Sequence, residues 1–171
     1  MTNKRLNKIT LAIMLLSAVA GMAGAGEWKS AAADDFRLEW MVDGDDLHVV
    51  FSSITSGWIA VGFDPTKKMK DANIIMGYVD DGEVIIEDHF GNGQISHRND
   101  EAMGGTNNLM NTDGSEIFGV TELIFTIPLD SGDPHDRVLV EGQTYKVIFA
   151  SHTKDKITMK HNRRTSREIT L

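Results

Sequence analysis

The sequence of 171 residues contains no cysteine. This absence excludes disulfides, zinc–thiolate sites, iron–sulfur clusters and the Cys-x-x-Cys-His attachment of a c-type haem. Any haem bound by this chain must therefore be held non-covalently. The length of the chain fits one domain with a core large enough to be stable without covalent cross-links.

Long apolar runs are also lacking beyond the N-terminal region, so no later stretch approaches the roughly 18 residues needed to span a bilayer. The first 25 residues carry three basic residues, an apolar run from Ile9 to Ala20 and the tripeptide Ala23-Gly24-Ala25. These features predict a secretory signal peptide over residues 1–25 that is removed after Ala25. We expect a periplasmic or secreted protein with no membrane span, a short N-terminal segment at 26–33 and one domain at 34–171.

An excess of positive charge is absent as well. The net charge of −8 becomes −11 when the predicted signal peptide, with its three basic residues, is removed. This acidity argues against nucleic acid as a partner. It suits solubility or docking to a basic partner.

The sequence further lacks the familiar catalytic motifs. It has no Gly-x-Ser-x-Gly elbow, no phosphate-binding glycine-rich loop before a helix and no cysteine nucleophile. The acidic pairs Asp45-Asp46 and Asp80-Asp81 fall in turns, where carboxylates are structural and solvated. The sequence therefore predicts a protein that is not itself an enzyme.

What the sequence does contain is a series of short segments with apolar residues at period two, which is typical of strands. Turn-forming residues separate several of them, at Asp43–Asp46 and at Asp80–Gly82. About seven such strands predict an all-β sandwich or barrel. The segments are 36–42, 47–52, 58–63, 73–79, 83–90, 117–127 and 145–151.

Two polar segments interrupt this pattern. Asn92 to Ser115 is rich in Gly, Asn, Asp and Thr, and we interpret it as a disordered flap or a lid. Asp130 to Gly142 contains Pro134 and two glycines, and we expect it to cross from one sheet to the other.

Met69 lies in a polar loop between two apolar strands, Trp58–Phe63 and Asn73–Val79. A thioether in such a loop is either a gap-filling apolar residue or a ligand for a soft metal or haem iron. A second ligand would come from elsewhere. The C-terminal region offers one, because His161 lies in a stretch from Lys154 to Glu168 that carries six Lys or Arg against two acids.

Three features together resemble the DOMON family, and in particular the b-type cytochrome domain of cellobiose dehydrogenases. They are the run Gly57-Trp58-Ile59-Ala60-Val61-Gly62-Phe63, the pattern Met69-x-x-Ala72-x-x-Ile75, and a late strand ending at Ala150 followed by His161. The resemblance covers about residues 34–171. It implies an immunoglobulin-like antiparallel β-sandwich, and many members of the family bind a b-type haem with Met and His axial ligands.

Carried over to this chain, the resemblance implies that Met69 and His161 are the iron ligands. Lysine replaces the histidine in some relatives, so Lys156 and Lys160 are alternatives, and His152 is a second histidine candidate. A neutral imidazole is ready to bind at neutral pH, whereas a lysine must first lose its proton, which favours His161. Copper, which thioethers and imidazoles also bind, is less favoured because the Met and His residues are dispersed.

A haem site also needs cations for the propionates and flat apolar surface for the porphyrin. Arg163 and Arg164 could supply the cations, or they could belong to a solvated basic tail. Four apolar residues are candidates for the porphyrin surface, and each has an alternative role as an ordinary core residue of the sandwich. The candidates are Trp58, Ile75, Phe90 and Phe149.

The remaining histidines are expected to be surface residues, with His48 on the solvent face of its strand and the others at strand ends or in loops. These others are His89, His97 and His135.

Two functional hypotheses follow. The first is an exported haem b electron-transfer domain that exchanges electrons with a redox partner protein, a dehydrogenase or cytochrome. Met/His ligation would leave no open position on the iron, so such a haem transfers electrons only. The second is a module that binds a sugar or another small molecule without haem, which would need exposed aromatic side chains.

Overall fold

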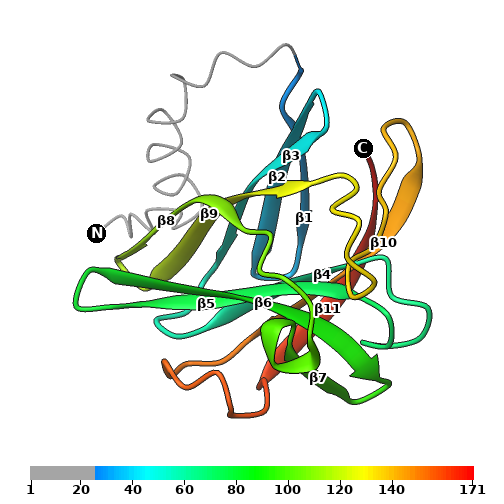
Figure 1. Ribbon diagram of the computed structural model, residues 1–171. Coiled ribbons are helices and arrows are strands. Elements are labelled where there is room, and N and C mark those ends of the chain that lie inside the picture. Colours follow the sequence, from blue (N-terminus) through cyan, green and yellow to red (C-terminus); the bar gives the residue numbers. More distant parts are fainter. Residues whose placement is uncertain (1–25) are drawn as a thin grey trace, which may run out of the picture.

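Two antiparallel sheets pack face to face in the computed structural model, which describes residues 26–171 (Figure 1). The five-stranded sheet has the order β1 (Lys29–Ala33), β2 (Phe36–Asp43), β3 (Asp46–Ser53), β9 (Val120–Pro128), β8 (Met110–Ile117). The six-stranded sheet has the order β11 (Arg163–Thr170), β10 (Thr144–Ser151), β4 (Ile59–Phe63), β5 (Asn73–Asp80), β6 (Glu83–Gly93), β7 (Ser96–Asn99). The predicted all-β sandwich is confirmed.

The main core lies between the two sheets. In β4 the side chains of Ile59, Val61 and Phe63 alternate with two small residues and point into this core, where each is fully buried. Aromatic rings of both sheets meet there, since Phe149 of β10 stacks on Phe51 of β3 with ring centroids 5.3 Å apart. Period-two patterning in the sequence therefore records which side chains face the opposite sheet.

Both hairpin turns expected from the sequence are present. Gly44 connects β2 to β3 with a φ of 61°, and Asp81 and Gly82 connect β5 to β6 with φ values of 49° and 86°. In the β5–β6 turn, the positive φ at both central residues of a two-residue loop matches the right-handed twist of the flanking strands.

One segment that the sequence predicts as a single strand contains a turn between two strands. The apolar segment 117–127 contains the turn between β8 and β9, formed by Phe118 and Gly119 with φ values of 53° and 73°. The sequence pattern missed this turn because Phe118, although apolar, is 83% exposed at its tip.

The interpretation of Asn92 to Ser115 as a disordered flap or lid was wrong. This segment contains β7, a 3-10 helix at Glu101–Met103 and most of β8. β7 pairs with β6 through its backbone, as an edge strand that needs no apolar face. The expected crossing at 130–142 is confirmed, because this segment connects β9 in one sheet to β10 in the other (yellow in Figure 1).

Both ends of the domain form edge strands. β1 pairs with β2, so the sandwich begins at Lys29, before the expected start at residue 34. The basic C-terminal stretch continues into β11, which pairs with β10 along its length. The predicted signal peptide at 1–25 lies outside the described residues. Within residues 26–171, no helix is long and apolar enough to cross a bilayer.

Candidate functional site

A second apolar cluster covers the outer face of the six-stranded sheet, the face that points away from the five-stranded sheet. Its buried members come from the start of β4, from β5 and from the loop before β5, and they are Trp58, Ala60, Ala72, Ile74 and Met76. The registers place them in rows across the sheet, with Ala150 of β10 opposite Ala60 and Ala60 opposite Met76. These side chains are buried although they lie outside the sandwich, because segments of the chain itself, including Ile157, pack over this face.

A glycine lets two larger side chains meet in the middle of this face. Gly62 separates Ile148 and Ile74 in the next row of the sheet. A Cβ atom on Gly62 would lie 2.8 Å from Cγ1 of Ile148 and 3.1 Å from Cγ1 of Ile74. The close approach of these side chains therefore requires glycine at this position.

Met69 packs against one edge of the outer-face cluster. Its loop is tightly constrained, because Lys68 and Asp71 adopt left-handed conformations with φ of 58° and 65°. The Thr66 hydroxyl donates a hydrogen bond of 2.5 Å to Oδ2 of Asp71, and the Ala72 N–H donates to the Met69 carbonyl at 3.1 Å. A half-buried thioether is thus held in a fixed loop.

Gly91 of β6 fixes this loop against the sheet. Its N–H donates to the Ala72 carbonyl at 2.9 Å, and its carbonyl accepts from Asp71 at 2.7 Å. A Cβ atom on Gly91 would lie 1.6 Å from the Met69 carbonyl oxygen. The position of Met69 therefore depends on the absence of a side chain at residue 91.

His161 lies in the loop of residues 152–162 that joins β10 to β11. This loop, orange in Figure 1, passes over the side of the six-stranded sheet that carries the cluster, and Ile157 within it packs on the cluster. The Asn162 N–H donates to the Ser151 carbonyl at 3.0 Å, which fixes the end of the loop. His161 is half-buried, and burial together with the charges of Arg164 and Lys160 lowers its pKa.

Two further histidines lie on the same face, where the sequence predicted surface residues. His89 of β6 is opposite Ile74 and only 7% exposed, and Nδ1 of His97 is 3.1 Å from its Nδ1. Burial, with smaller effects of the nearby His89 and His161, lowers the pKa of His97 to about 4. The prediction for His89 was wrong because it considered only its position near a strand end, whereas β7 pairs beyond it and covers it.

The hydrogen bonds of this histidine pair fix one of its protons. Nε2 of His89 is 2.8 Å from Oε2 of Glu87, and a carboxylate can only accept, so His89 carries a proton at Nε2. One proton lies between the two Nδ1 atoms, and the tautomers of the rings decide which of them donates.

Trp58 and His152 form one end of the face. Their rings stack with centroids 6.4 Å apart, and Nδ1 of His152 accepts a hydrogen bond of 3.1 Å from the Lys154 N–H. Nε1 of Trp58 is buried and has no hydrogen-bond partner in the described part of the chain. This donor is therefore available to an acceptor from outside the described chain.

The two candidate arginines have different surroundings. Arg164 lies opposite Ala150, on the outer face. Arg163 points the other way, forming an ion pair with Asp35 and donating to the Ile54 carbonyl at 3.3 Å. Only Arg164 shares the face of Met69 and His161.

Three of the four predicted apolar lining residues lie elsewhere. Ile75 and Phe149 are buried in the main core, on the opposite side of the sheet from Met69. Phe90 contacts the ring of His135, with centroids 5.5 Å apart, at the end of the sandwich. Of the four, Trp58 alone belongs to the outer-face cluster.

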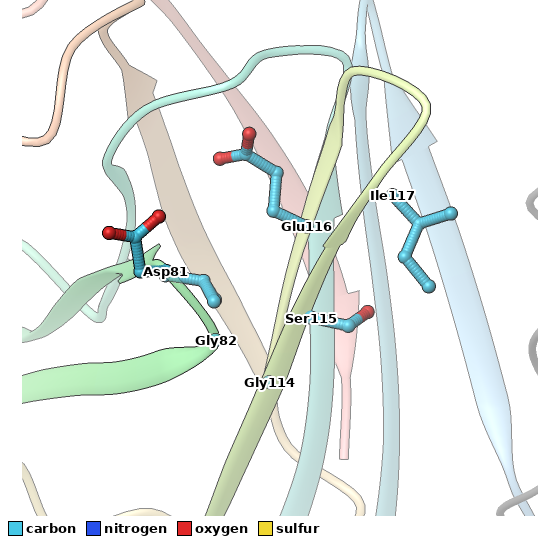
Figure 2. Close-up of a pocket in the computed structure, with 7 residues that line it drawn as sticks. Asp81, Gly82, Gly114, Ser115, Glu116 and Ile117 are labelled. Carbon is cyan, nitrogen blue, oxygen red and sulfur yellow. The ribbon is translucent and has the colours of Figure 1, made fainter.

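A separate hollow of about 380 Å³ lies between the β5–β6 turn and β8 (Figure 2). Asp81 and Glu116 present carboxylates to it, and burial followed by the charge of Asp155 raises the pKa of Glu116. Imidazole, thioether and aromatic side chains are absent from its lining in the described structure. Its chemistry therefore differs from that of the outer face.

Comparisons with known proteins agree with this architecture. The cytochrome b domain of pyranose dehydrogenase from Coprinopsis cinerea superposes with a TM-score of 0.61 at 13% identity, covering 84% of this chain and 81% of that one. The cytochrome domain of Myriococcum thermophilum cellobiose dehydrogenase gives a TM-score of 0.57 at 10% identity, covering 85% and 82%. At such identities the likeness shows the fold alone.

A relative in sequence is MOXD1 homolog 2 from Drosophila melanogaster, which is 25% identical over 124 residues. The match covers 71% of this chain but 16% of that protein, so this chain spans a small part of its length. The family model of the DOMON domain matches residues 32–152, most of the sandwich. The chain belongs to the DOMON domain family.

Proposed function

We propose that this protein is an exported b-type haem-binding domain that transfers electrons, with Met69 and His161 as the axial ligands of the iron. The observation that carries the proposal is that one thioether and one imidazole, from loops far apart in sequence, both lie on a single apolar face of the sheet. The similarity of the fold to cytochrome b domains supports it.

The residues of this face fit a haem. Its apolar side chains suit contact with a porphyrin, and the unpartnered Nε1 of Trp58 and the guanidinium of Arg164 would be donors for the propionates. A bound haem would supply a reversible one-electron iron couple. Trp58, Met76 and Ile74 would exclude water from the group.

The protonation state of His161 suits ligation. Only a neutral imidazole has a lone pair to donate, and the lowered pKa of His161 keeps it neutral at pH 7. Lys156 and Lys160 are exposed to solvent, whereas His161 is half-buried. His152 is held against Trp58, with its Nδ1 already accepting a hydrogen bond. These differences favour His161.

The role we assign is electron exchange with a redox partner protein outside the cytoplasm. Met69 and His161 together would leave no open position on the iron, which favours electron transfer over chemistry at the metal. A sugar-binding role would require exposed aromatic platforms, and among the described residues only Phe118 is a strongly exposed large aromatic side chain. We therefore retain the haem assignment.

The test is titration of the purified, haem-free protein with hemin, followed by visible spectra in the oxidised and dithionite-reduced states. We expect one hemin per chain, a sharp reduced α-band and a b-type pyridine haemochrome. A protein that takes up no hemin, or whose spectrum is that of a five-coordinate iron, would overturn the proposal. In the first case, screening for glycan binding would be the next step.

A further inference from the structure

Four aspartates and a histidine gather at one end of the sandwich, away from the outer face described above. Asp88 comes from β6, Asp100 follows β7, and Asp133, His135 and Asp136 belong to the crossing segment between β9 and β10. Asp88 lies opposite Ile75, so its side chain points to the inner side of the sheet. Three segments far apart in sequence thus contribute carboxylates to one place.

The carboxylates are close together and deeply buried. One oxygen each of Asp88, Asp100 and Asp136 lie within 4.8 Å of one another, and an oxygen of Asp100 is equally close to Asp133 and His135. Asp88 and Asp100 are 0% exposed. Burial of carboxylates at such distances is costly unless a positive charge compensates them.

Several of these oxygens lack a partner. Asp88 accepts one hydrogen bond, of 3.2 Å, from the Asn108 N–H at Oδ2, and its Oδ1 has none. Oδ2 of Asp136 accepts from the Ser131 hydroxyl at 2.6 Å, and its Oδ1 has none. Neither side-chain oxygen of Asp100 has a partner in the described structure. Fully buried, unpartnered carboxylate oxygens that converge on one point indicate a ligand between them.

No lysine or arginine in the described part of the chain fills this role, and His135 is the basic side chain beside the cluster. Among residues 26–171, no lysine or arginine forms an ion pair with Asp88, Asp100 or Asp136. Arg137, the arginine of the crossing segment, forms an ion pair with Asp64. Burial and mutual repulsion raise the pKa of Asp88 to about 7 and that of Asp100 to about 6. Both directions agree with the shortage of protein partners around these two carboxylates.

We propose that Asp88, Asp100 and Asp136, with Asp133 beside them, bind a hard divalent cation, for which Ca²⁺ is the best match. The donor set consists of carboxylate oxygens, which Ca²⁺ and related ions prefer to the nitrogen and sulfur ligands of zinc or copper. Four acids can also supply the six to eight oxygens that Ca²⁺ takes, with water completing the shell. The ion ties β6, the 3-10 region and the crossing segment together.

The test uses the haem-free protein, stripped of metal with EDTA and then freed of chelator, so that its outcome is independent of haem binding. Calorimetric titration with CaCl₂ at pH 7.5 is expected to show one site per chain. At about 1 mM Ca²⁺, far above a micromolar Kd, we expect the melting temperature to rise by about 5 °C or more. Terbium luminescence that is displaced by Ca²⁺ gives an independent readout.

Asp100→Asn is expected to weaken Ca²⁺ binding at least about tenfold and to remove the thermal response. Because it relieves repulsion, it should not lower the melting temperature of the metal-free protein. Glu101→Gln is the matched control, since Glu101 is exposed, lies next to Asp100 and is not part of the cluster. If Asp100→Asn fails to fold, Asp136→Asn serves the same purpose.

Two results would overturn the proposal. One is the absence of heat, terbium luminescence and thermal stabilisation in the wild type up to about 5 mM Ca²⁺, a concentration that even weak extracellular sites bind. The other is an equal loss of binding in Glu101→Gln, which would indicate a diffuse acidic surface and not a site.

Discussion

Asp88 and His89 are adjacent in β6, yet their side chains lie on opposite faces of the sheet. Asp88 is opposite Ile75, which belongs to the main core, and His89 is opposite Ile74, which belongs to the outer-face cluster. One strand therefore contributes to both the carboxylate cluster and the candidate haem face. Alternation within a strand is the physical basis of this arrangement.

Met69→Ala is expected to lower the midpoint potential of the haem-loaded protein by an amount on the order of 0.1 V and to leave the iron five-coordinate or bound to water. The thioether stabilises the reduced iron relative to nitrogen or water ligands. Redox titration followed by visible spectroscopy measures both effects. Met159→Ala is the control, because Met159 is another half-buried thioether, in the loop that carries His161. If Met159→Ala gives the change and Met69→Ala does not, the ligand assignment is wrong.

His161→Ala is expected to reduce hemin affinity at least about tenfold, because an axial imidazole is removed from an otherwise unchanged apolar face. Hemin titration of the two variants His161→Ala and His152→Ala tests this. His152→Ala should keep the low-spin six-coordinate spectrum, since His152 packs on Trp58. A six-coordinate spectrum retained in His161→Ala would exclude His161 as the ligand.

Gly91→Ala should destabilise the protein by about 2 to 4 kcal/mol, because the new Cβ would overlap the Met69 backbone. Urea unfolding of the haem-free protein measures the loss. Gly93→Ala is the matched control in the same strand. There the Cβ would meet the Ser96 hydroxyl at 2.5 Å, a side chain that can rotate away, and we expect a loss below about 1 kcal/mol. Equal losses would show that the Met69 loop is not fixed by Gly91.

His97 is expected to make the haem-free protein less stable as the pH falls. Its pKa is about 4 in the folded protein against 6.5 for an ordinary histidine, so between these values the unfolded chain binds the additional proton. The contribution of neutral His97 to the free energy of unfolding is complete above pH 6.5. It is lost towards pH 4, with a slope of at most about 1.4 kcal/mol per pH unit.

Comparison of the wild type with His97→Asn isolates this effect, because other groups titrate in the same range. Asp88 acts in the opposite direction, since its pKa is raised to about 7 and its ionisation favours unfolding as the pH rises from 4 to 7. Both proteins share that contribution. The free energy of unfolding of the wild type minus that of His97→Asn should therefore decrease as the pH falls from 6.5 to 4. A difference that does not vary with pH would contradict the burial of a neutral His97.

Much of the fold was predictable because core strands carry period-two patterns. The segments around Phe51, Val61, Ile75 and Phe149 were identified as strands and are strands. All four edge strands, β1, β7, β8 and β11, were missed, since edge strands are held by backbone pairing and their side chains show no apolar alternation. The β8–β9 turn was missed because an exposed Phe118 continues the apolar pattern through it.

For the candidate site, the sequence by itself excluded attachment of a haem through cysteine, and it indicated Met69 and His161 as candidate iron ligands. Only the tertiary structure decided which side of each strand faces the second sheet. Period two assigns neighbouring residues to opposite faces without saying which face becomes the core, and this is why Ile75 and Phe149 lie inside while His89 lies outside. Likewise, Asp88, Asp100 and Asp136 are dispersed in the sequence, and long-range strand pairing brings their carboxylates together.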